Sequence, residues 1–173
     1  RENIAYPGST ISLGFDELQT IEIIRGIENG VDVSVYCKEE FNAAQMKALR
    51  LGLEEKLDVS RFADAQYDYM QMEELKQAVR SGMNMDDICN PKFSHSVMRE
   101  IRLASELNYD LTRYAKLGYS GEVLRQIRLA KKEEIDLTFF VEDNYDEYQL
   151  NEIRLGIHSC VDITKYLLHV YNG

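Results

Sequence analysis

Few residues of this 173-residue chain have the type and spacing that catalysis or metal binding would need. His158 and Cys160 are two residues apart, so they would point to different faces of any helix. The remaining histidines and cysteines lack metal-ligand spacing to these two or to one another; they are His95, His169, Cys37 and Cys89. No glycine-rich phosphate loop, nucleophile elbow or HExxH motif occurs. We therefore expect no catalytic residue, no metal site, no cofactor and no enzymatic activity.

Basic residues form the most regular pattern that could bind a ligand. One recurs at a constant spacing along the chain, and we call this set the basic column: Arg50, Lys76, Arg102, Arg128 and Arg154. The simplest interpretation is a set of ion pairs, because Glu54 and Glu106 each lie four residues after a member of the column. Capping aspartates of an adjacent hairpin are further candidate partners. The alternative is a ladder that binds nucleic acid or another polyanion, although the net charge of −10 weighs against it.

A second basic feature is confined to one part of the chain. Arg99 and Arg102 lie three residues apart, and Arg125 and Arg128 repeat that spacing one unit later. We expect these four side chains to stack side by side, with Lys132 in the same basic segment. This face is either a plain solvated surface or a dock for an acidic peptide or a phosphate group.

Four apolar or aromatic residues depart from the types that the other repeats carry at the same positions. They are Phe139, Tyr148, Tyr69 and Met70. Exposed aromatic and methionine side chains are enriched at protein interfaces, so these residues are candidates for partner binding. Local differences in packing are the alternative explanation.

The elements that must position these side chains follow from a 26-residue unit that recurs six times without insertion or deletion. Each unit opens with an aromatic residue, at Phe15, Phe41, Tyr67, Phe93, Tyr119 and Tyr145. An aspartate or asparagine follows it at a constant distance in every unit, at Asp32, Asp58, Asn84, Asp110, Asp136 and Asp162. A fixed period in this range is typical of stacked repeat proteins.

Each unit is predicted to begin with a helix of about 13 residues. A short polar N-cap follows the aromatic residue, and Gln19, Gln45, Gln71 or Gln149 completes a capping box three residues later. Val97 and Val123 replace this glutamine in units four and five. A glycine or alanine recurs in the helix, at Gly26, Gly52, Ala78, Ala104, Ala130 and Gly156, and predicts close approach of a neighbouring helix.

The end of the first helix and the start of a second are also marked. Gly30, Gly82 and Asn108 suit a left-handed residue that closes the helix, whereas Lys56, Glu134 and Cys160 are poorer caps at the same position. The recurring aspartate or asparagine then caps a second helix of roughly 6 to 8 residues.

These features predict an all-α fold, an α-solenoid of six helix-turn-helix repeats, each with a long and a short helix. The repeats span 15–40, 41–66, 67–92, 93–118, 119–144 and 145–170. By analogy with other helical-hairpin arrays we expect a right-handed superhelix. Residues 1–14 do not fit the repeat and are interpreted as a leader or linker. Tyr171 and Asn172 match the start of a unit, so 171–173 are interpreted as the beginning of a truncated seventh repeat in a longer protein.

The unit resembles tandem repeats of the form QMxEIRLGLExGxDVSxYA, which occur in large multidomain proteins carried by mobile genetic elements of Gram-positive bacteria. The resemblance covers residues 15–170 and is clearest in units one, two and six. It implies a repeat region attached to other domains, and it implies no activity.

Composition limits the remaining function classes. Apolar content of 45% and charged content of 29% indicate a folded protein, and no apolar run is long enough to span a membrane. Three widely spaced cysteines argue against a disulfide framework, and we expect a cytoplasmic protein. The sequence thus favours a protein–protein interaction scaffold of unknown oligomeric state. Polyanion binding through the basic column and a purely structural spacer are the alternatives.

Overall fold

The computed structural model describes the backbone of residues 14–171 and the side chains of residues 14–160. This part of the chain is all-helical, with eight α-helices, two 3-10 turns and no strand. The expected leader before residue 14 and the asparagine of the expected seventh repeat, at position 172, lie outside the described residues.

A long helix begins each of the six units two residues after the opening aromatic residue. The first five are α2 (Glu17–Glu28), α3 (Ala43–Glu54), α4 (Tyr69–Arg80), α5 (His95–Glu106) and α7 (Gly121–Lys132), each of 12 residues. The predicted capping boxes are confirmed with Gln19, Gln45, Gln71 and Gln149. In α7, where Val123 replaces the glutamine, the Ser120 hydroxyl alone accepts from the backbone of the first turn.

These five helices end in the same way. The residue after the C-cap has a positive φ in all of them, at Gly30, Lys56, Gly82, Asn108 and Glu134. The next N–H donates to the carbonyl five residues earlier, for example from Val31 to Gly26 at 3.0 Å, which defines a Schellman motif. Lys56 and Glu134, expected to be poorer caps, therefore adopt the same left-handed conformation as the glycines.

The second element of each repeat is shorter than expected. It is a 3-10 turn in repeats one and three, η1 (Val33–Val35) and η2 (Met85–Asp87), and repeat two has only turns over residues 60–62. Repeats four and five have five-residue helices, α6 (Thr112–Lys116) and α8 (Thr138–Glu142). The recurring aspartate or asparagine accepts from the N–H two residues on in repeats one to five. It is the N-cap only of η1 and η2, whereas Leu111 and Leu137 stand at the N-caps of α6 and α8 without a side-chain capping bond, so the predicted capping is confirmed in repeats one and three.

One position explains why only two of these elements are α-helices. Gly118 and Asn144 have positive φ and close α6 and α8 with a second Schellman motif. Glu40, Gln66 and Lys92 occupy the same position in the first three repeats and do not adopt that conformation. The first three second elements therefore pass into an irregular connection after a single turn.

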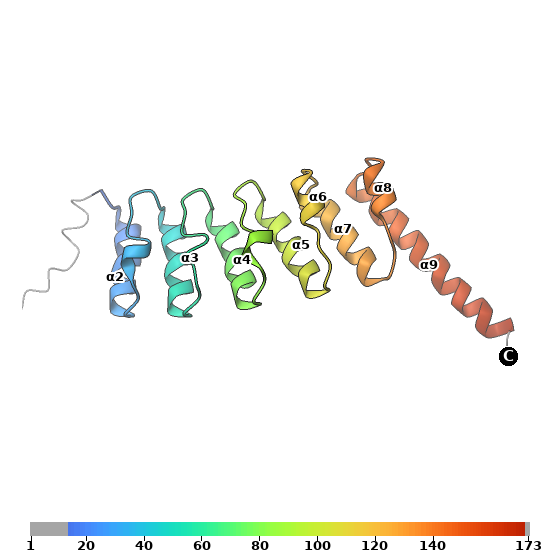
Figure 1. The fold of residues 1–173 in the computed structure, drawn as a ribbon, viewed down its shortest axis with the longest axis horizontal. Helices are drawn as coiled ribbons and strands as arrows, with labels where there is room; N and C mark the ends of the chain where they lie inside the picture. The colour runs from blue at the N-terminus through green and yellow to red at the C-terminus, as the bar shows by residue number, and fades with distance from the viewer. Residues whose placement is uncertain (1–13, 172–173) are drawn as a thin grey trace, which may run out of the picture. The chain divides into compact units, whose positions relative to one another are not determined.

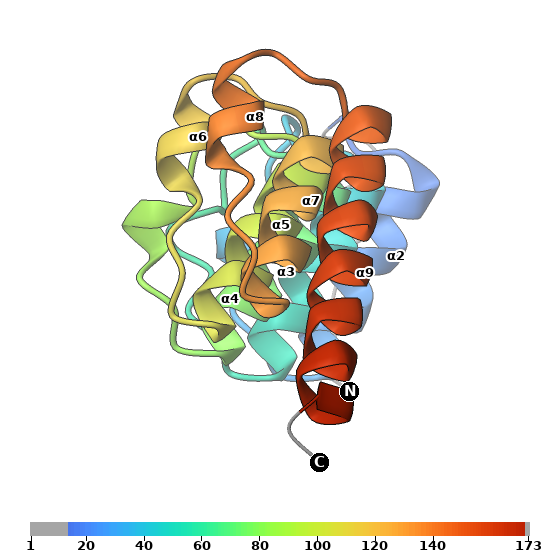
Figure 2. The ribbon, with the colours of Figure 1, turned by 90° about the vertical axis from the view of Figure 1, so that its right-hand side faces the viewer.

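The chain divides into two compact units, one ending at His95 and one beginning at Ser96. In the first, α2, α3 and α4 pack side by side (Figure 1) over a core that includes Leu49 and Leu75. The second elements contribute Tyr36, Phe62 and Ile88, all fully buried. In the second unit, α7 packs against α9 (Glu147–Tyr171), as seen in Figure 2, and Ile127, Leu137 and Leu150 are buried.

The recurring small residue accommodates the second element of its own hairpin. A methyl group on Gly26 would overlap the Tyr36 hydroxyl, and one on Gly52 would lie 2.8 Å from Val59 Cγ1. The prediction of close approach is therefore correct, but the prediction that a neighbouring helix makes it is only partly so. Only at Gly52 does the next helix also contribute, through the side chain of Lys76.

Repeat six differs from the other five. Its predicted second helix, starting after Asp162, is absent, because α9 continues without a break from Glu147 to Tyr171. Cys160 stands where the other repeats have the left-handed residue, and it remains helical. A continuous helix keeps every i to i−4 hydrogen bond and needs no residue with positive φ, whereas Lys56 and Glu134 adopt that conformation at the same position in repeats two and five.

Candidate functional site

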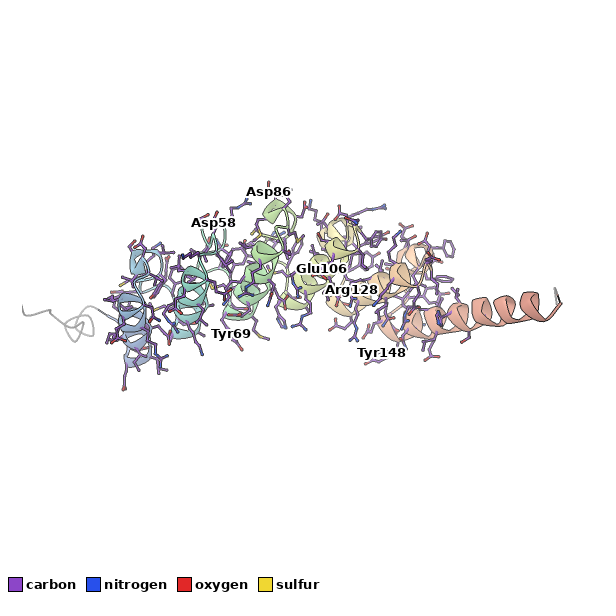
Figure 3. The ribbon with its side chains drawn as sticks, turned by 90° about the horizontal axis from the view of Figure 1, so that it is seen from below. Asp58, Tyr69, Asp86, Glu106, Arg128 and Tyr148 are labelled. Atoms are coloured by element: carbon purple, nitrogen blue, oxygen red, sulfur yellow. The ribbon has the colours of Figure 1, made fainter. Side chains whose placement is uncertain are left out.

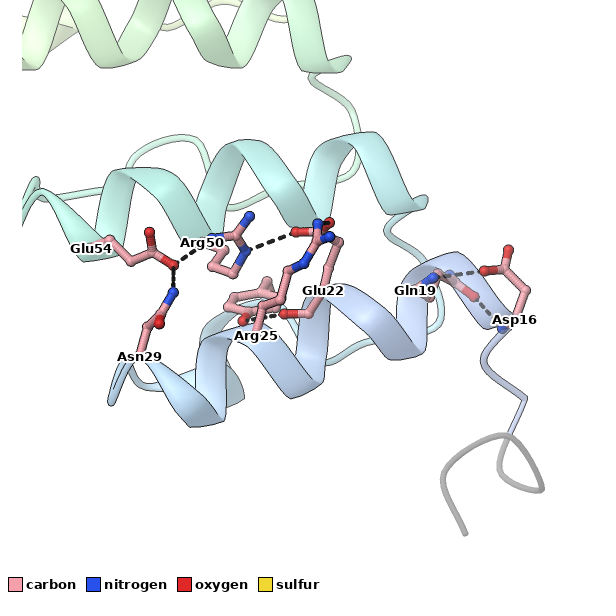
Figure 4. A network of polar contacts seen from close by, with 8 residues as sticks. Asp16, Gln19, Glu22, Arg25, Asn29, Arg50 and Glu54 are labelled. Atoms are coloured by element: carbon pink, nitrogen blue, oxygen red, sulfur yellow. Dashed lines mark hydrogen bonds and ion pairs between the residues drawn. The ribbon is translucent and has the colours of Figure 1, made fainter. Parts of the chain in front are cut away.

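Members of the basic column in the first compact unit are buried in ion pairs. The Arg50 guanidinium donates to Glu22 at 2.8 Å and to Glu54 at 2.5 Å, as Figure 4 shows. The Arg50 and Glu22 side chains are each only 7% exposed. The amide of Asn29 holds Glu54 from the other side at 2.7 Å and is the largest cause of its lowered pKa.

Lys76 is the member of the basic column that has an alanine in place of the glutamate from the preceding repeat. Relative to Lys76, Ala48 occupies the repeat position that Glu22 occupies relative to Arg50. The Lys76 ammonium instead pairs with Glu73 on its own helix at 2.7 Å, and its stem is buried against Gly52. The column in this unit is therefore committed to structural contacts, and a polyanion would have to displace its carboxylate partners.

The second compact unit repeats this arrangement. Arg128 pairs with Glu100 at 2.5 Å, and Arg102 lies 3.5 Å from Glu106. The expected pairing with Glu54 and Glu106 is thus present. A glutamate of the preceding repeat also pairs with the column, and this pairing was not predicted. Glu22 and Glu100 occupy the same repeat position, so their recurrence could have indicated it. Arg50, Lys76, Arg128 and Arg154 pair with glutamates rather than with capping aspartates.

The expected stack of four arginines is divided by these pairs. Arg102 and Arg128 have side chains only 16% exposed, so they do not join a solvent-facing cluster. Arg99 and Arg125 are exposed on α5 and α7, and Lys132 is exposed at the end of α7. Of these, Arg125 lines a groove.

This groove lies between α7 and α9 and has a volume of about 290 Å³. Its walls combine residues one turn apart on each helix: Glu122, Arg125 and Gln126 from α7, and Glu147, Tyr148 and Asn151 from α9. Two of the residues predicted to bind a partner, Arg125 and Tyr148, therefore come together here. The remaining four were not predicted, because their polar types are ordinary for exposed helix positions.

Arg154 fixes the polar side of the groove. Its Nε donates to Gln126 at 3.0 Å, and its Nη2 donates to Asn151 at 3.1 Å. Its Nη1 pairs with Glu133 at 2.5 Å, and the whole residue is buried. One guanidinium thus holds a side chain from each wall, Gln126 from α7 and Asn151 from α9.

Tyr148 is the most exposed large hydrophobic residue in the described part of the chain, at 77%. Figure 3 shows it projecting from the first turn of α9. Leu155, two turns later on the same face of α9, is also exposed. Tyr148 and Leu155 therefore leave apolar surface exposed on this face of α9.

The other aromatic candidates lie elsewhere. Phe139 is exposed on α8 and makes an edge contact with Phe140 at 5.6 Å between ring centroids. Tyr69 and Met70 are exposed at the start of α4 in the first compact unit. None of these three lines the α7–α9 groove.

Two larger hollows lie beside the turns that end the first helices. One, of about 640 Å³, is lined by Asn29, Gly30, Val31, Asp32, Leu53, Glu54 and Lys56. The other, of about 470 Å³, includes Tyr109, whose ring faces the Lys131 ammonium at 5.2 Å. Both are lined largely by turn residues that already cap a helix.

The described residues contain no group of three or more His, Cys, Asp or Glu side chains arranged to hold a metal ion. Burial raises the pKa of the Cys37 and Cys89 thiols, which lowers their reactivity. Within residues 14–171, no helix combines the length and apolar character needed to cross a bilayer. Comparison with protein-family models, curated proteins and solved structures finds no match to this chain.

Proposed function

We propose that this chain is a non-catalytic interaction scaffold, an α-solenoid of six 26-residue repeats that binds another protein or a peptide. The repeat supports this architecture, because one helical hairpin cannot bury its apolar face alone and must pack on its neighbours. The resemblance to repeats of mobile-element proteins supports a place within a larger multidomain protein.

The observation that carries the binding function is Tyr148 at the edge of the α7–α9 groove. An aromatic ring left 77% exposed beside a preformed groove is the kind of anchor that protein interfaces bury. Arg125 adds a positive charge to the groove, and Glu122 and Glu147 add negative ones. The groove would therefore select where the charges lie along a bound peptide, and not the net charge of the peptide.

Peptide selection followed by titration tests the proposal. A displayed library of random peptides is selected on the wild-type chain, and dissociation constants of enriched peptides are measured by calorimetry. Tyr148→Ala should weaken binding by about 30-fold, the effect of losing an interface anchor of about 2 kcal/mol. Leu117→Ala, at a position 66% exposed and outside the groove, is the matched control and should change nothing.

The alternatives predict different outcomes in the same experiment. A structural spacer would enrich no peptide. Polyanion binding would appear as oligonucleotide affinity that falls steeply and linearly in log salt, and would be insensitive to Tyr148→Ala. Either result would contradict the proposed function.

A further inference from the structure

Repeat six keeps residues whose role in the other repeats depends on a folded-back second element. Gly26 and Gly52 are buried under such elements, and a methyl group at either would collide with them. Gly156 occupies the same repeat position, is exposed, and has nothing within 4 Å of where a Cβ would stand. A glycine inside a helix is costly relative to alanine, and the continuous α9 gives it no purpose.

Gln149 is a second residue of this kind. In repeats one to three the equivalent glutamine completes the capping box and also donates its amide to the carbonyl of the aromatic residue that opens the next repeat. These bonds join Gln19 to Phe41, Gln45 to Tyr67 and Gln71 to Phe93, each at 2.6 Å. Gln149 makes the two capping bonds with Asp146, but the described structure gives its amide no such carbonyl, and it is exposed. The residue in the equivalent position after Gln149 is Tyr171, an aromatic residue in register.

The sequence after Gly156 supplies the missing partner. Asp162, Thr164 and Tyr166 have the spacing of Asp110, Thr112 and Tyr114 in repeat four, where Asp110 accepts from the Thr112 N–H and Thr112 begins α6. Tyr166 also follows Gly156 by the same interval at which Tyr36 follows Gly26. In repeat one this tyrosine lies over the glycine and donates to the Glu22 carbonyl at 3.0 Å.

We propose that the Gly156 face of α9 is a docking surface for residues 162–166 of the same chain. Repeat six then exchanges between the continuous helix and a closed hairpin in which α9 ends at Cys160. In the closed form Tyr166 covers Gly156, and Gln149 donates to the Tyr171 carbonyl. The inference rests on the repeat register and not on peptide binding, so either can fail without the other.

The switch position is Cys160, because the closed form requires it to adopt the left-handed conformation that Gly30 and Gly82 adopt, with φ of 71°. Cys160→Gly favours closure, and Cys160→Ala favours the continuous helix. Both are made in a background with Cys37→Ala and Cys89→Ala, since Ala63 and Ala115 occupy that position in other repeats. Spin labels are attached at Glu147→Cys and Asn172→Cys.

Electron paramagnetic resonance then measures the distance between the labels. The continuous helix separates them by about 37 Å, at about 1.5 Å per residue. The closed hairpin brings them to about 10 Å, the spacing of packed helices. We expect Cys160→Ala to give the long distance and Cys160→Gly to give a substantial short-distance population.

Adding Gly156→Ala to the Cys160→Gly variant should reduce the closed-to-open ratio at least fivefold, because the methyl group fills the space for Tyr166 and also favours helix. Ser159→Ala, which raises helix propensity without filling that space, should reduce the ratio less. The proposal is wrong if Cys160→Gly leaves only the long distance, or if Gly156→Ala and Ser159→Ala act alike. If the short distance disappears when labelled chain is diluted with unlabelled chain, the segment docks on a second copy. That result would also contradict the proposal.

Discussion

The hydroxyl of Tyr36 donates a hydrogen bond to the backbone carbonyl of Glu22 at 3.0 Å, directly over Gly26. This contact joins the two elements of repeat one through a carbonyl of the first helix. It also sets the size limit at Gly26, because any side chain there would occupy the space of the hydroxyl. The carboxylate of the same Glu22 receives Arg50 of the next repeat, so one residue ties its hairpin together and links it to its neighbour (Figure 4).

Gly26→Ala should lower the free energy of unfolding by about 1–2 kcal/mol, because the overlap with Tyr36 outweighs the gain of about 1 kcal/mol in helix propensity. Tyr36→Phe removes the overlapping oxygen, so the double variant should be more stable than the sum of the single effects predicts. Urea denaturation measures all three. Ala44→Gly, at an exposed position of α3, reports the propensity term alone. Strict additivity would contradict the proposed overlap.

Gln45→Glu should destabilise the chain by about 2–3 kcal/mol at neutral pH. A carboxylate still accepts from the Asn42 N–H, but it cannot donate to the carbonyls of Ala65 and Tyr67, and it brings a negative charge to them. The deficit should shrink at acid pH, where the introduced carboxyl group is protonated and can donate. Thermal unfolding of Gln149→Glu serves as the control, since Gln149 makes only capping bonds among the described residues of the continuous α9, and it should stay within about 0.5 kcal/mol of wild type. Equal losses at both positions would show that the capping box alone matters.

A double-mutant cycle on Glu22 and Arg50 should give a coupling energy above about 1 kcal/mol. Glu22→Ala leaves a buried guanidinium with Glu54 as its sole carboxylate partner and should cost about 3 kcal/mol. The same cycle on Arg61 and Asp86, whose side chains are 49% and 71% exposed, should give less than about 1 kcal/mol. Similar values for the two pairs would mean that burial does not strengthen the first.

Stability should fall between about pH 10 and pH 12. Burial is the largest cause that raises the pKa of Tyr36 and Tyr67 to about 12, above their ordinary value of 10. Between these values the unfolded chain loses the phenolic protons while the folded chain keeps them, so the contribution present below pH 10 is lost as pH rises. Denaturation at stepped pH measures this slope. In the variant with Tyr36→Phe and Tyr67→Phe, the free energy of unfolding should fall less steeply with pH. An unchanged slope would mean that other groups cause the loss of stability.

Local features of this fold were predictable because each depends on residues close in the sequence. The N-cap of α3 at Asn42 and its capping box with Gln45 follow from side-chain oxygens within one turn of the helix. The α-helices in repeats four and five also have a local signal, in Gly118 and Asn144, although it was recognised only with the backbone conformation known.

The candidate site was predictable only in part. Tyr148 and Arg125 were identified from the sequence as candidates, but their meeting in one groove depends on how α7 and α9 pack. Arg102 and Arg128 looked equivalent to Arg99 and Arg125 in spacing. Arg102 lies beside Glu106 on its own helix and Arg128 pairs with Glu100 of the preceding repeat, and a count of basic residues cannot reveal these contacts.

The sequence by itself determined the period, the helical character and the start of every long helix, because these are fixed by short-range capping and by side-chain size. Only the tertiary structure decided which element fills the space over Gly26, which carboxylate receives Arg50, and that α9 runs on through Cys160. Each of these depends on whether a distant segment of chain supplies a covering surface. Local sequence can favour that contact but cannot guarantee it.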